Sequence, residues 1–590
     1  MLKLLKLFRY LRAKEWLFCL FSLVFVCAQV VLELMIPDYM SEITTLIETP
    51  GSAMGDVWSA GGMMLLCAFG SLVSSIAVCF FASRIAANFS KRLRKEMFYK
   101  VESFTLEEIN AFSTASLITR STNDVVQVQM LVVLSLQVVV KAPLMAVWAI
   151  MKIAGKAWQW SLATGIAVVL LVVILSFAIV RTFPRFKRIQ WLQDSLNQSA
   201  RENLTGIRVV HAYNAEEYQE KKFEKVNTEL LNNSLFANRT MTLLSPFMSL
   251  VMNSLNMSIY WIGAVLINAV AINGAASIAS RVDIFADMIV FMSYAMQVIM
   301  SFIMIVMVII IMPRALEAAK RISEVLATEP KVVSGSVTDS GDVRGTVEFK
   351  NVSFTYPGGS GSVISDVSFK ADRGETVAFI GSTGSGKTTL MNLIPRFYDA
   401  SEGEVLVDGV NVKDYDLEAL YAKIGYVSQK AVMFTGTVAD NVAFGQNADK
   451  RMLADALEIS HSADFISELE DKENAHMARG GTNFSGGQKQ RLSIARALCR
   501  DCEILIFDDT FSALDFKTDR ELRDALKDRT AGQTKLIVAQ RIGTIMSADR
   551  IVVLDEGRVV GIGTHRELLK SCEVYRQIAL SQLSEEELAI

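Results

Sequence analysis

The stretch Gly381-Ser382-Thr383-Gly384-Ser385-Gly386-Lys387-Thr388 decides the fold of the C-terminal half of this chain. It follows the apolar run 376–380 and opens a helical pattern at Thr389, the strand, loop, helix order that a phosphate-binding loop requires. Glycines let backbone N–H groups surround phosphate, Lys387 reaches the β and γ oxygens, and the Thr388 hydroxyl suits Mg²⁺. The positive end of the helix dipole lies at the same place. A flexible glycine-rich turn is the simpler alternative, but the full motif in this context predicts binding of ATP or GTP.

Two further segments extend this site. The apolar run Ile504-Leu505-Ile506-Phe507-Asp508 ends in a carboxylate that can hold Mg²⁺ through water. Upstream of it, Asn483-Phe484-Ser485-Gly486-Gly487-Gln488-Lys489-Gln490-Arg491 leads into a helical pattern. This segment closely resembles the signature motif of the ATP-binding cassette family. The resemblance identifies the nucleotide as ATP.

More motifs of that family follow one another in its order over residues 345–583. Tyr356 stands where the family stacks an aromatic ring on adenine, Gln429 stands at its Q-loop, and Ser512-Ala513-Leu514-Asp515 matches its D-loop. The resemblance implies an α/β P-loop ATPase domain that binds ATP and Mg²⁺. The implied metal-site residues are Thr388, Gln429 and Asp508, and the implied ATP contacts are Tyr356, Gly381, Ser382, Thr383, Gly384, Ser385, Gly386, Lys387, Thr388, Thr389, Ser485, Gly486, Gly487 and Gln488.

Two positions depart from the family pattern. Asp509 stands where the family usually has the Glu that polarises the attacking water, and Asp is one C–C bond shorter, about 1.5 Å of lost reach. Gln540 stands where the family usually has a His that contacts the γ-phosphate, and a carboxamide cannot carry positive charge. Both changes weaken the same step, so the sequence predicts a degenerate, hydrolytically impaired site. The alternative is that both are tolerated in an active enzyme.

The N-terminal half has the composition of a membrane domain. The chain has 590 residues, 51% of them hydrophobic, with a mean hydropathy of +0.33. Six apolar segments are each near or above the ~20 residues that cross a bilayer. They cover residues 16–37, 58–82, 130–151, 159–181, 243–271 and 285–312. The first is too long for a signal peptide and is followed by five more.

Positive charge predicts the orientation of these spans. Lys and Arg concentrate in residues 83–124 and 182–240, which are therefore expected to be cytoplasmic. Residues 38–57 have neither Lys nor Arg but contain four acidic side chains, so this loop is expected to face outward. Both termini and the ATPase domain then lie in the cytoplasm of a multi-pass cell membrane protein. The net charge of −3 argues against a nucleic-acid partner.

The cytoplasmic loops continue the helical pattern far past the membrane. If residues 58–102 form one helix, it is about 67 Å long, over twice the ~30 Å hydrocarbon core. This is similar to the exporter type of the family, which two stretches match in detail, residues 116–124 and 202–213. In that family each stretch neighbours a short coupling helix, so docking on an ATPase domain is expected near residues 104–114 and 211–217. Residues 2–14 are predicted to form a basic amphipathic helix on the inner leaflet.

Evidence about the cargo is limited to a few side chains in the spans. Met288, Met292, Met296, Met300, Met304 and Met307 recur on one drifting side of the sixth span. They form either an adaptable drug or lipid surface or, more simply, a helix-packing or lipid-facing side. Glu33 and Lys141 are intramembrane charges, which face a cavity or pair with another group. Lys141 precedes Pro143 by two residues, so it can instead satisfy a carbonyl freed at a kink.

Together these features predict a half-transporter of exporter type. Residues 1–312 are expected to form an α-helical six-span membrane domain with long intracellular extensions, 313–344 a linker, 345–583 the ATPase domain and 584–590 a tail. In the family each ATP lies between the Walker motifs of one half and the signature motif of the other. Asp509 and Gln540 therefore imply a degenerate site, while Ser485–Gln488 serve the active site of a second, different half.

This pattern resembles heterodimeric bacterial multidrug exporters, which implies efflux of amphipathic small molecules and contact with membrane lipid. One alternative is a homodimeric lipid or peptide exporter with slow hydrolysis. Another is a nucleotide-gated channel or regulatory membrane protein that binds ATP without transport.

Overall fold

The computed structural model describes residues 7–48, 52–154, 157–272, 278–446 and 448–588. It divides into two compact units. The first contains the residues up to Glu102 together with Ala115–Thr328, and the second contains Ser103–Thr114 together with the residues from Glu329 onward. The short segment Ser103–Thr114 therefore belongs with the C-terminal half of the sequence, although parts of the first unit precede and follow it in the chain.

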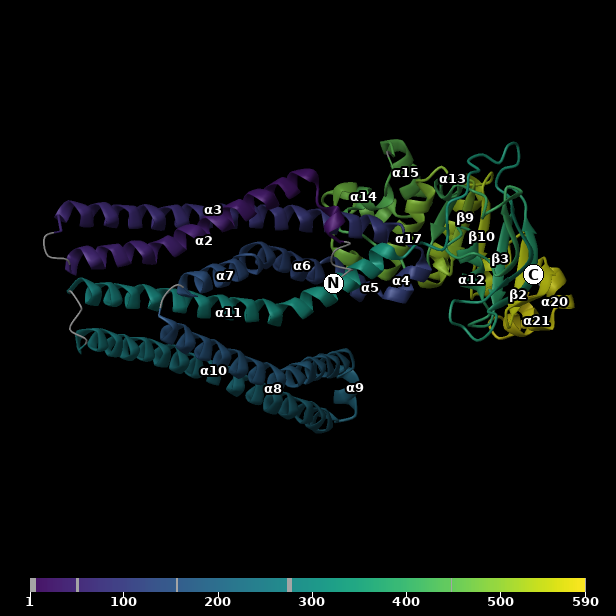
Figure 1. Cartoon of the computed structure of the whole chain (residues 1–590). Coiled ribbons are helices and arrows are strands. Elements are labelled where there is room, and N and C mark those ends of the chain that lie inside the picture. The colour runs from purple at the N-terminus through teal and green to yellow at the C-terminus, as the bar shows by residue number, and fades with distance from the viewer. Residues whose placement is uncertain (1–6, 49–51, 155–156, 273–277, 447, 589–590) are drawn as a thin grey trace. The chain divides into compact units, whose positions relative to one another are not determined.

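The first unit consists of long helices (Figure 1). Among the described residues, six helical stretches are long and apolar enough to cross a membrane, as the sequence predicts. The elements are α2 (Ala13–Glu48), α3 (Met54–Glu102), α5 (Thr114–Ser121), α6 (Asn123–Leu134), η2 (Ser135–Val139), α7 (Lys141–Ala154), α8 (Trp158–Thr205), α9 (Ile207–Ala212), α10 (Glu216–Ile272) and α11 (Ile278–Ala327).

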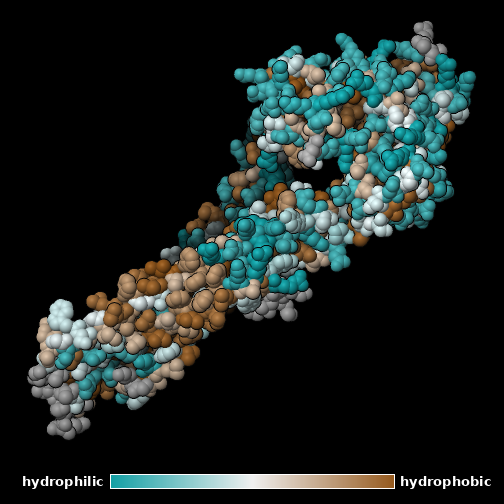
Figure 2. Space-filling view, turned by 90° about the horizontal axis from the view of Figure 1, so that it is seen from above, coloured by the Kyte–Doolittle hydropathy of each residue, from teal (hydrophilic) through white to brown (hydrophobic). Residues whose placement is uncertain are grey.

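These helices extend beyond their apolar cores, which confirms the exporter-type prediction. α3 has 49 residues and contains the whole predicted helix 58–102, so at 1.5 Å per residue it is about 74 Å long. On the face shown in Figure 2, hydrophobic side chains gather over one part of the first unit, whereas the second unit is largely hydrophilic. An apolar exterior on a helical unit is expected where lipid replaces water as the surrounding solvent.

The two intramembrane charges pair with each other. Lys141 Nζ lies 2.9 Å from Glu33 Oε1, and Gln29 and Ser71 also donate hydrogen bonds to that carboxylate. Of the alternatives for Lys141, the structure therefore shows pairing. The π-helical turn η2 ends at Val139, two residues before Lys141, and its wider backbone ring locally interrupts the α-helix. Burying the two charges as a hydrogen-bonded pair avoids the cost of an isolated ion in lipid.

The N-terminal segment differs from the predicted helix over residues 2–14. Residues 1–6 lie outside the described part, Phe8–Tyr10 form a 3₁₀ turn, and α2 begins only at Ala13. Arg92 of α3 explains the break, because its guanidinium pairs with Glu15 at 2.9 Å and also donates to the Tyr10 carbonyl. The backbone N–H of Arg12 donates to Glu15 as well, at 2.6 Å. These contacts end the first turn and start a new helix, so one continuous amphipathic helix up to Lys14 is not formed.

The last helix of the first unit continues into the predicted linker. α11 runs through Pro313 to Ala327, so the first half of residues 313–344 is helical. Arg321 in this extension pairs with the buried Asp124 of α6 through two hydrogen bonds of 2.6 and 2.8 Å. Arg120 of α5 donates to the Arg321 carbonyl and to Glu324. The extension is thereby fixed to the segment that matches the exporter type.

The second unit contains two larger sheets and a two-stranded one. An antiparallel sheet has the order β2-β1-β4-β5, and a six-stranded sheet has the order β12-β11-β3-β10-β9-β6. In the latter β11, β3, β10, β9 and β6 are parallel, while β12 pairs antiparallel at the edge. The bounds are β1 (Val347–Phe354), β2 (Ile364–Ala371), β3 (Thr376–Gly381), β4 (Glu402–Val407), β5 (Val410–Asn411), β6 (Ile424–Val427), β7 (Gly436–Thr437), β8 (His476–Met477), β9 (Ile504–Asp508), β10 (Thr534–Val538), β11 (Arg550–Asp555) and β12 (Arg558–Gly563).

Helices fill the spaces around these sheets. They are α4 (Leu106–Phe112), α12 (Lys387–Leu393), α13 (Leu417–Lys423), α14 (Val438–Val442), α15 (Lys450–Ile459), α16 (Ala463–Ser467), α17 (Gly486–Leu498), α18 (Phe516–Arg529), α19 (Ile542–Ile545), α20 (His565–Ser571), α21 (Glu573–Leu580) and α22 (Glu585–Leu588), with 3₁₀ turns η3 (Lys472–Asn474), η4 (Arg479–Gly481) and η5 (Thr510–Ala513).

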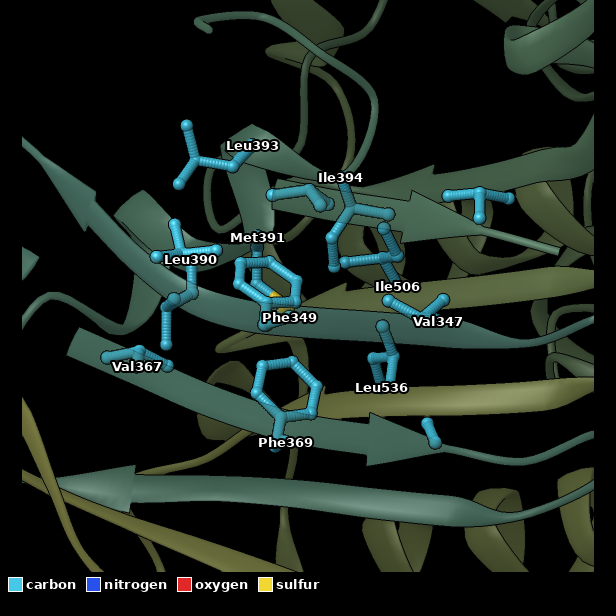
Figure 3. Packing of buried hydrophobic residues seen from close by; sticks show 14 of the residues in the cluster. Val347, Phe349, Val367, Phe369, Leu390, Met391, Leu393, Ile394, Ile506 and Leu536 are labelled. Atoms are coloured by element: carbon cyan, nitrogen blue, oxygen red, sulfur yellow. The ribbon is translucent and has the colours of Figure 1, made fainter. Parts of the chain in front are cut away.

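The core of the second unit fixes the helix that follows the phosphate-binding loop. Figure 3 shows α12 side chains meeting aromatic rings from the antiparallel sheet and aliphatic side chains from the parallel one. Phe349 and Phe369 stack with ring centroids 4.5 Å apart, next to the fully buried Leu390 and Met391. Each fully buried side chain of this size contributes roughly 1.5–3 kcal/mol relative to exposure. The loop before α12 is therefore anchored by a packed helix.

Residues 103–114 show the docking expected for the first coupling segment. Thr105 caps α4, and Glu108 accepts hydrogen bonds from Thr105 and from the Lys331 backbone N–H at 3.1 Å. Desolvation raises the pKa of the Glu108 carboxyl, but these hydrogen bonds outweigh it and hold the pKa below its usual value. For the second segment, residues 211–217, α9 and the start of α10 lie within the first unit. Docking of that segment stays a prediction.

Candidate nucleotide-binding site

The sheet topology brings the predicted site residues to one edge. β3, β10, β9 and β6 are parallel neighbours, so their carboxyl ends meet there. The phosphate-binding loop follows β3, and Gln540, Asp509 and Gln429 follow β10, β9 and β6 in turn. Open α/β sheets bind ligands at the carboxyl ends of their strands. Residues separated by up to 160 positions in the sequence thus converge because the strands are adjacent.

The phosphate-binding loop has the backbone that its glycines predict. Gly386 is the N-cap of α12 at a φ of 92°, in the left-handed region that favours glycine. A Cβ at Gly381 would come within 2.1 Å of the Leu554 carbonyl oxygen, so this position also requires glycine. Lys387 Nζ donates to the carbonyl oxygens of Gly381 and Ser382 at 2.9 and 2.7 Å. The lysine thus folds over the loop, where it can exchange these contacts for phosphate oxygens.

The electrostatics of the loop suit a magnesium nucleotide. Burial lowers the pKa of Lys387, against the opposing charges of Asp509 and Asp508. Burial raises the pKa of Asp508, and the Thr388 hydroxyl counteracts this by donating to Oδ1 at 2.9 Å. A hydroxyl and a carboxylate held together are hard oxygen ligands of the kind that Mg²⁺ prefers beside phosphates. Thr388 and Asp508 therefore fit the cation, and its charge would favour the ionised Asp508.

The two departing residues touch each other. Gln540 Nε2 donates to Asp509 Oδ2 at 2.7 Å, and Gln429 Nε2 donates to the same oxygen at 3.1 Å. Asp509 is 6% exposed and has a left-handed backbone at φ 49°, and its buried Oδ1 has no hydrogen-bond partner among the described residues. Two amide donors thus occupy the carboxylate oxygen that faces the Q-loop. The arrangement holds a carboxylate in place without a titratable group at position 540.

The signature residues form a separate group at the start of a helix. Ser485 is the N-cap of α17, and its side chain and that of Gln488 cap each other's backbone at 3.2 and 2.8 Å. Ser485 and Gly486 are exposed, and α17 packs on α14, α15 and β6. A capped, exposed helix N-terminus with two glycines presents free backbone N–H groups and a positive dipole end, which suit phosphate. The signature residues therefore face solvent, which is expected of a surface that binds a second molecule.

An aromatic cluster adjoins the predicted adenine position. The Tyr356 hydroxyl lies 3.1 Å from Thr389 Oγ1, and its ring is 5.3 Å from that of Tyr398 in an edge-on arrangement. Tyr398 in turn accepts a hydrogen bond from Asn110 of α4 at 3.2 Å. The sequence analysis missed Tyr398 and Asn110, and only the aromatic run Phe397-Tyr398 after α12 could have drawn attention to them. The structure thus connects α4 with the side chain predicted to stack on adenine.

Tyr426 is a second missed residue. Its hydroxyl donates to Asn392 Oδ1 at 3.2 Å and lies near the Asp508 carboxylate. Burial raises the pKa of this tyrosine, with the charge of Asp508 acting in the same direction. Tyr426 precedes the Q-loop by three residues, so its position on β6 points the hydroxyl toward the metal-site carboxylate. Tyr426 could be recognised as a site residue only from the pairing of β6 with β9, and that pairing is not evident from the sequence.

Comparison with known proteins gives matches over nearly the whole chain. The family profile for the ABC transporter transmembrane region matches residues 19–302, and the ABC transporter profile matches residues 364–512. An uncharacterized ABC transporter ATP-binding protein of Mycobacterium tuberculosis is 37% identical over 561 residues, which cover 92% of this chain and 93% of that protein. An ATP-dependent lipid A-core flippase of Pseudomonas fluorescens is 32% identical over 85% of this chain and 81% of the flippase.

A solved structure shows the same fold. A bacterial Atm1-family ABC exporter with ATP bound superimposes with a TM-score of 0.78 over 97% of this chain and 98% of that chain. Its sequence is 22% identical, so this likeness concerns the fold.

Proposed function

The chain belongs to the ABC transporter family, and we propose that it is one half of an ATP-driven exporter whose own Walker site hydrolyses ATP poorly. Its signature motif, Ser485–Gln488, completes the hydrolytic site of a different half-transporter. The complex would act as an ATPase and translocase for amphipathic molecules, with multidrug efflux as the expected activity. Both termini and the ATPase domain face the cytoplasm, in keeping with the Lys and Arg of residues 83–124 and 182–240.

The contact between Gln540 and Asp509 carries this proposal. A general base must come within about 2.6–3.2 Å of its water. The side chain of Asp509 is one C–C bond shorter than that of Glu. The carboxamides of Gln540 and Gln429 also donate hydrogen bonds to its Oδ2. At position 540 the side chain has no protonated form that could stabilise charge on the γ-phosphate. ATP binding needs neither group, because it relies on the phosphate-binding loop, on Tyr356 and on the hydroxyl and carboxylate of Thr388 and Asp508.

A second candidate function is a homodimeric lipid exporter with slow hydrolysis. The ATP-dependent lipid A-core flippase of Pseudomonas fluorescens, which is 32% identical, favours it. In a homodimer, every site would pair the Walker residues of one copy of this chain with the signature motif of the other copy. Mutation of either the Walker residues or the signature motif would then impair both ATP sites. In the heterodimer, only mutation of the signature motif would impair the hydrolytic site, and this difference separates the two proposals.

The purified chain is expected to bind ATP with Mg²⁺ but to hydrolyse it negligibly. Binding uses the intact loop, whereas hydrolysis lacks a base of full reach and a cationic partner for the γ-phosphate. The test measures ATP binding and phosphate release by the full chain in lipid nanodiscs. Lys387→Ala is the control that should lose binding itself. Brisk phosphate release that disappears in Lys387→Ala would refute the degenerate-site proposal.

A further inference from the structure

Residues of α2, α7, α10 and α11 of the membrane unit line a cavity of about 530 Å³. Its volume lies in the range of roughly 300–1,000 Å³ that is typical of sites for drug-sized molecules. Most of its wall comes from one side of α11. The lining residues are Met40, Met145, Asn256, Ile289, Met292, Ser293, Met296, Gln297, Met300 and Met304. We call it the methionine cavity.

The structure divides the methionine stripe of the sixth span into different roles. Met288 is buried in the helix core against Gly263 and Trp160, and Met307 is more than half exposed. The four methionines between them line the cavity, since steps of four residues stay on one side of a helix. Helix packing thus accounts for the first member of the stripe. The four central methionines instead line the cavity.

Thioether side chains give this wall an adaptable apolar surface. Methionine is unbranched, has three rotatable bonds and is polarisable, so it fills irregular shapes at low cost. Six of the ten lining residues are methionine, and they come from α2, α7 and α11. A wall built in this way does not select one rigid shape. It favours apolar molecules of varied outline.

Two pairs of opposite charges lie on the helices that line the cavity. Glu33 and Lys141, on α2 and α7, form one pair at 2.9 Å. Asp38 and Lys152, on the same two helices, form another at 2.6 Å, and Tyr294 of α11 donates to Asp38 at 2.5 Å. Each pair has no net charge, and no lining residue is ionisable. A charged occupant would therefore be desolvated without a counter-ion, which is costly.

Two carboxamides supply polarity to an otherwise apolar wall. Asn256 Oδ1 and Gln297 Oε1 are buried and find no hydrogen-bond partner within the part of the chain that the structure describes. Buried polar atoms without partners are uncommon, and each has a cost that a ligand can remove. A carboxamide offers both donors and acceptors through rotation of its end group. Asn256 on α10 and Gln297 on α11 both line the cavity, and rotation of either end group would turn its buried oxygen toward a small uncharged head group bound there.

We propose that the methionine cavity is the cargo-binding site and that it selects uncharged amphipathic molecules of drug size. The apolar body lies on Met292, Met296, Met300 and Met304, and the hydrogen-bonding head lies at Asn256 and Gln297. This assignment rests on the exporter function proposed above. It narrows the expected amphipathic cargo to molecules without net charge.

Photoaffinity labelling of the full chain in lipid nanodiscs tests the proposal. Three dodecyl-diazirine probes differ only in their head groups, which are a primary carboxamide, a trimethylammonium and a carboxylate. Labelled peptides are quantified by mass spectrometry relative to the peptide around the exposed Leu65, Leu66 and Phe69, which reports lipid partitioning. The carboxamide probe should label the peptide with Met292–Met304 roughly tenfold more than either ion does. Excess dodecanamide without a diazirine should abolish this labelling.

Two variants locate the head group. Gln297→Leu keeps nearly the same volume but removes the hydrogen-bonding group, so carboxamide labelling should fall roughly tenfold. Met307→Leu, on the same helix outside the cavity, should leave it unchanged. Equal labelling by all three probes, preference for an ionic probe, or labelling that dodecanamide does not suppress would overturn the proposal. If Gln297→Leu fails to fold, the comparison of the three probes on the wild-type chain still tests the proposal.

The outcomes separate this proposal from the exporter function. Impaired hydrolysis at the Walker site together with absent cavity labelling refutes the cavity alone. Head-group-selective labelling together with brisk hydrolysis by the lone chain refutes the degenerate half-transporter and leaves the cavity as a ligand site.

Discussion

Ser485→Arg is expected to lower ATP turnover and transport by the assembled exporter at least about a hundredfold, whereas Asp509→Ala leaves most turnover intact. Ser485 caps α17 and stands beside the free N–H groups of Gly486 and Gly487, which would contact the γ-phosphate bound to the other half. An arginine there removes the cap and blocks the approach of the partner. Asp509→Ala removes a base that already lacks reach, so little hydrolysis depends on it.

The two variants are compared in complexes isolated through a tag on this chain. Ser571→Arg on α20 is a matched control, because it places the same bulky cation on an exposed serine away from the site. Turnover by that control should equal wild type. In a homodimer, Ser485→Arg and Asp509→Ala would both be severe. A greater loss from Asp509→Ala would show that this chain's own Walker site does the work.

Restoring Asp509→Glu together with Gln540→His should raise hydrolysis at this chain's Walker site, by roughly ten- to a hundredfold. Glu adds the missing reach of about 1.5 Å, and an imidazole can donate a charged hydrogen bond to the γ-phosphate. The pair should act together, since both groups serve one chemical step and their effects are not additive. Each single change alone is therefore expected to give much less.

This gain is measured most clearly in a complex that already carries Ser485→Arg. That change silences the other site, so the remaining phosphate release reports this chain's Walker site alone. Asp509→Asn with Gln540→His is the control, because the carboxamide has the shape of Asp but cannot accept a proton. If the Glu and His pair gives no increase over this control, the defect does not lie in these two side chains.

Those parts of the site that depend on local sequence could be predicted. The phosphate-binding loop needs glycine at Gly381 and Gly386 for reasons of backbone geometry, and these positions can be recognised in the sequence. The order of strands then places Gln429, Asp508 and Gln540 at one edge. The hydrogen bonds from both carboxamides to a single oxygen of Asp509 could not be predicted, because they depend on rotamers that only the packed site selects.

The membrane unit shows the same contrast. Apolar runs gave the six spans, and long polar helical patterns gave their extension past the bilayer, as in α3. The break before α2 was missed, because it depends on Arg92, a residue more than 75 positions away, which pairs with Glu15. The methionines of the sixth span also have different surroundings, since Met288 packs against Gly263 whereas Met296 lines the cavity. Long-range partners of this kind are set by helix packing, which sequence periodicity does not specify.

Vanadate trapping with photoreactive 8-azido-ATP tests most directly whether hydrolysis occurs at the other half's Walker site. Without turnover, in the cold, the nucleotide should label both chains of the complex, since both phosphate-binding loops bind ATP. After turnover with vanadate, the trapped diphosphate should label mainly the partner, because under the proposed function Asp509 and Gln540 support cleavage in this chain only weakly. Trapped label found mainly on this chain, or a complex that contains no second kind of half, would contradict the account.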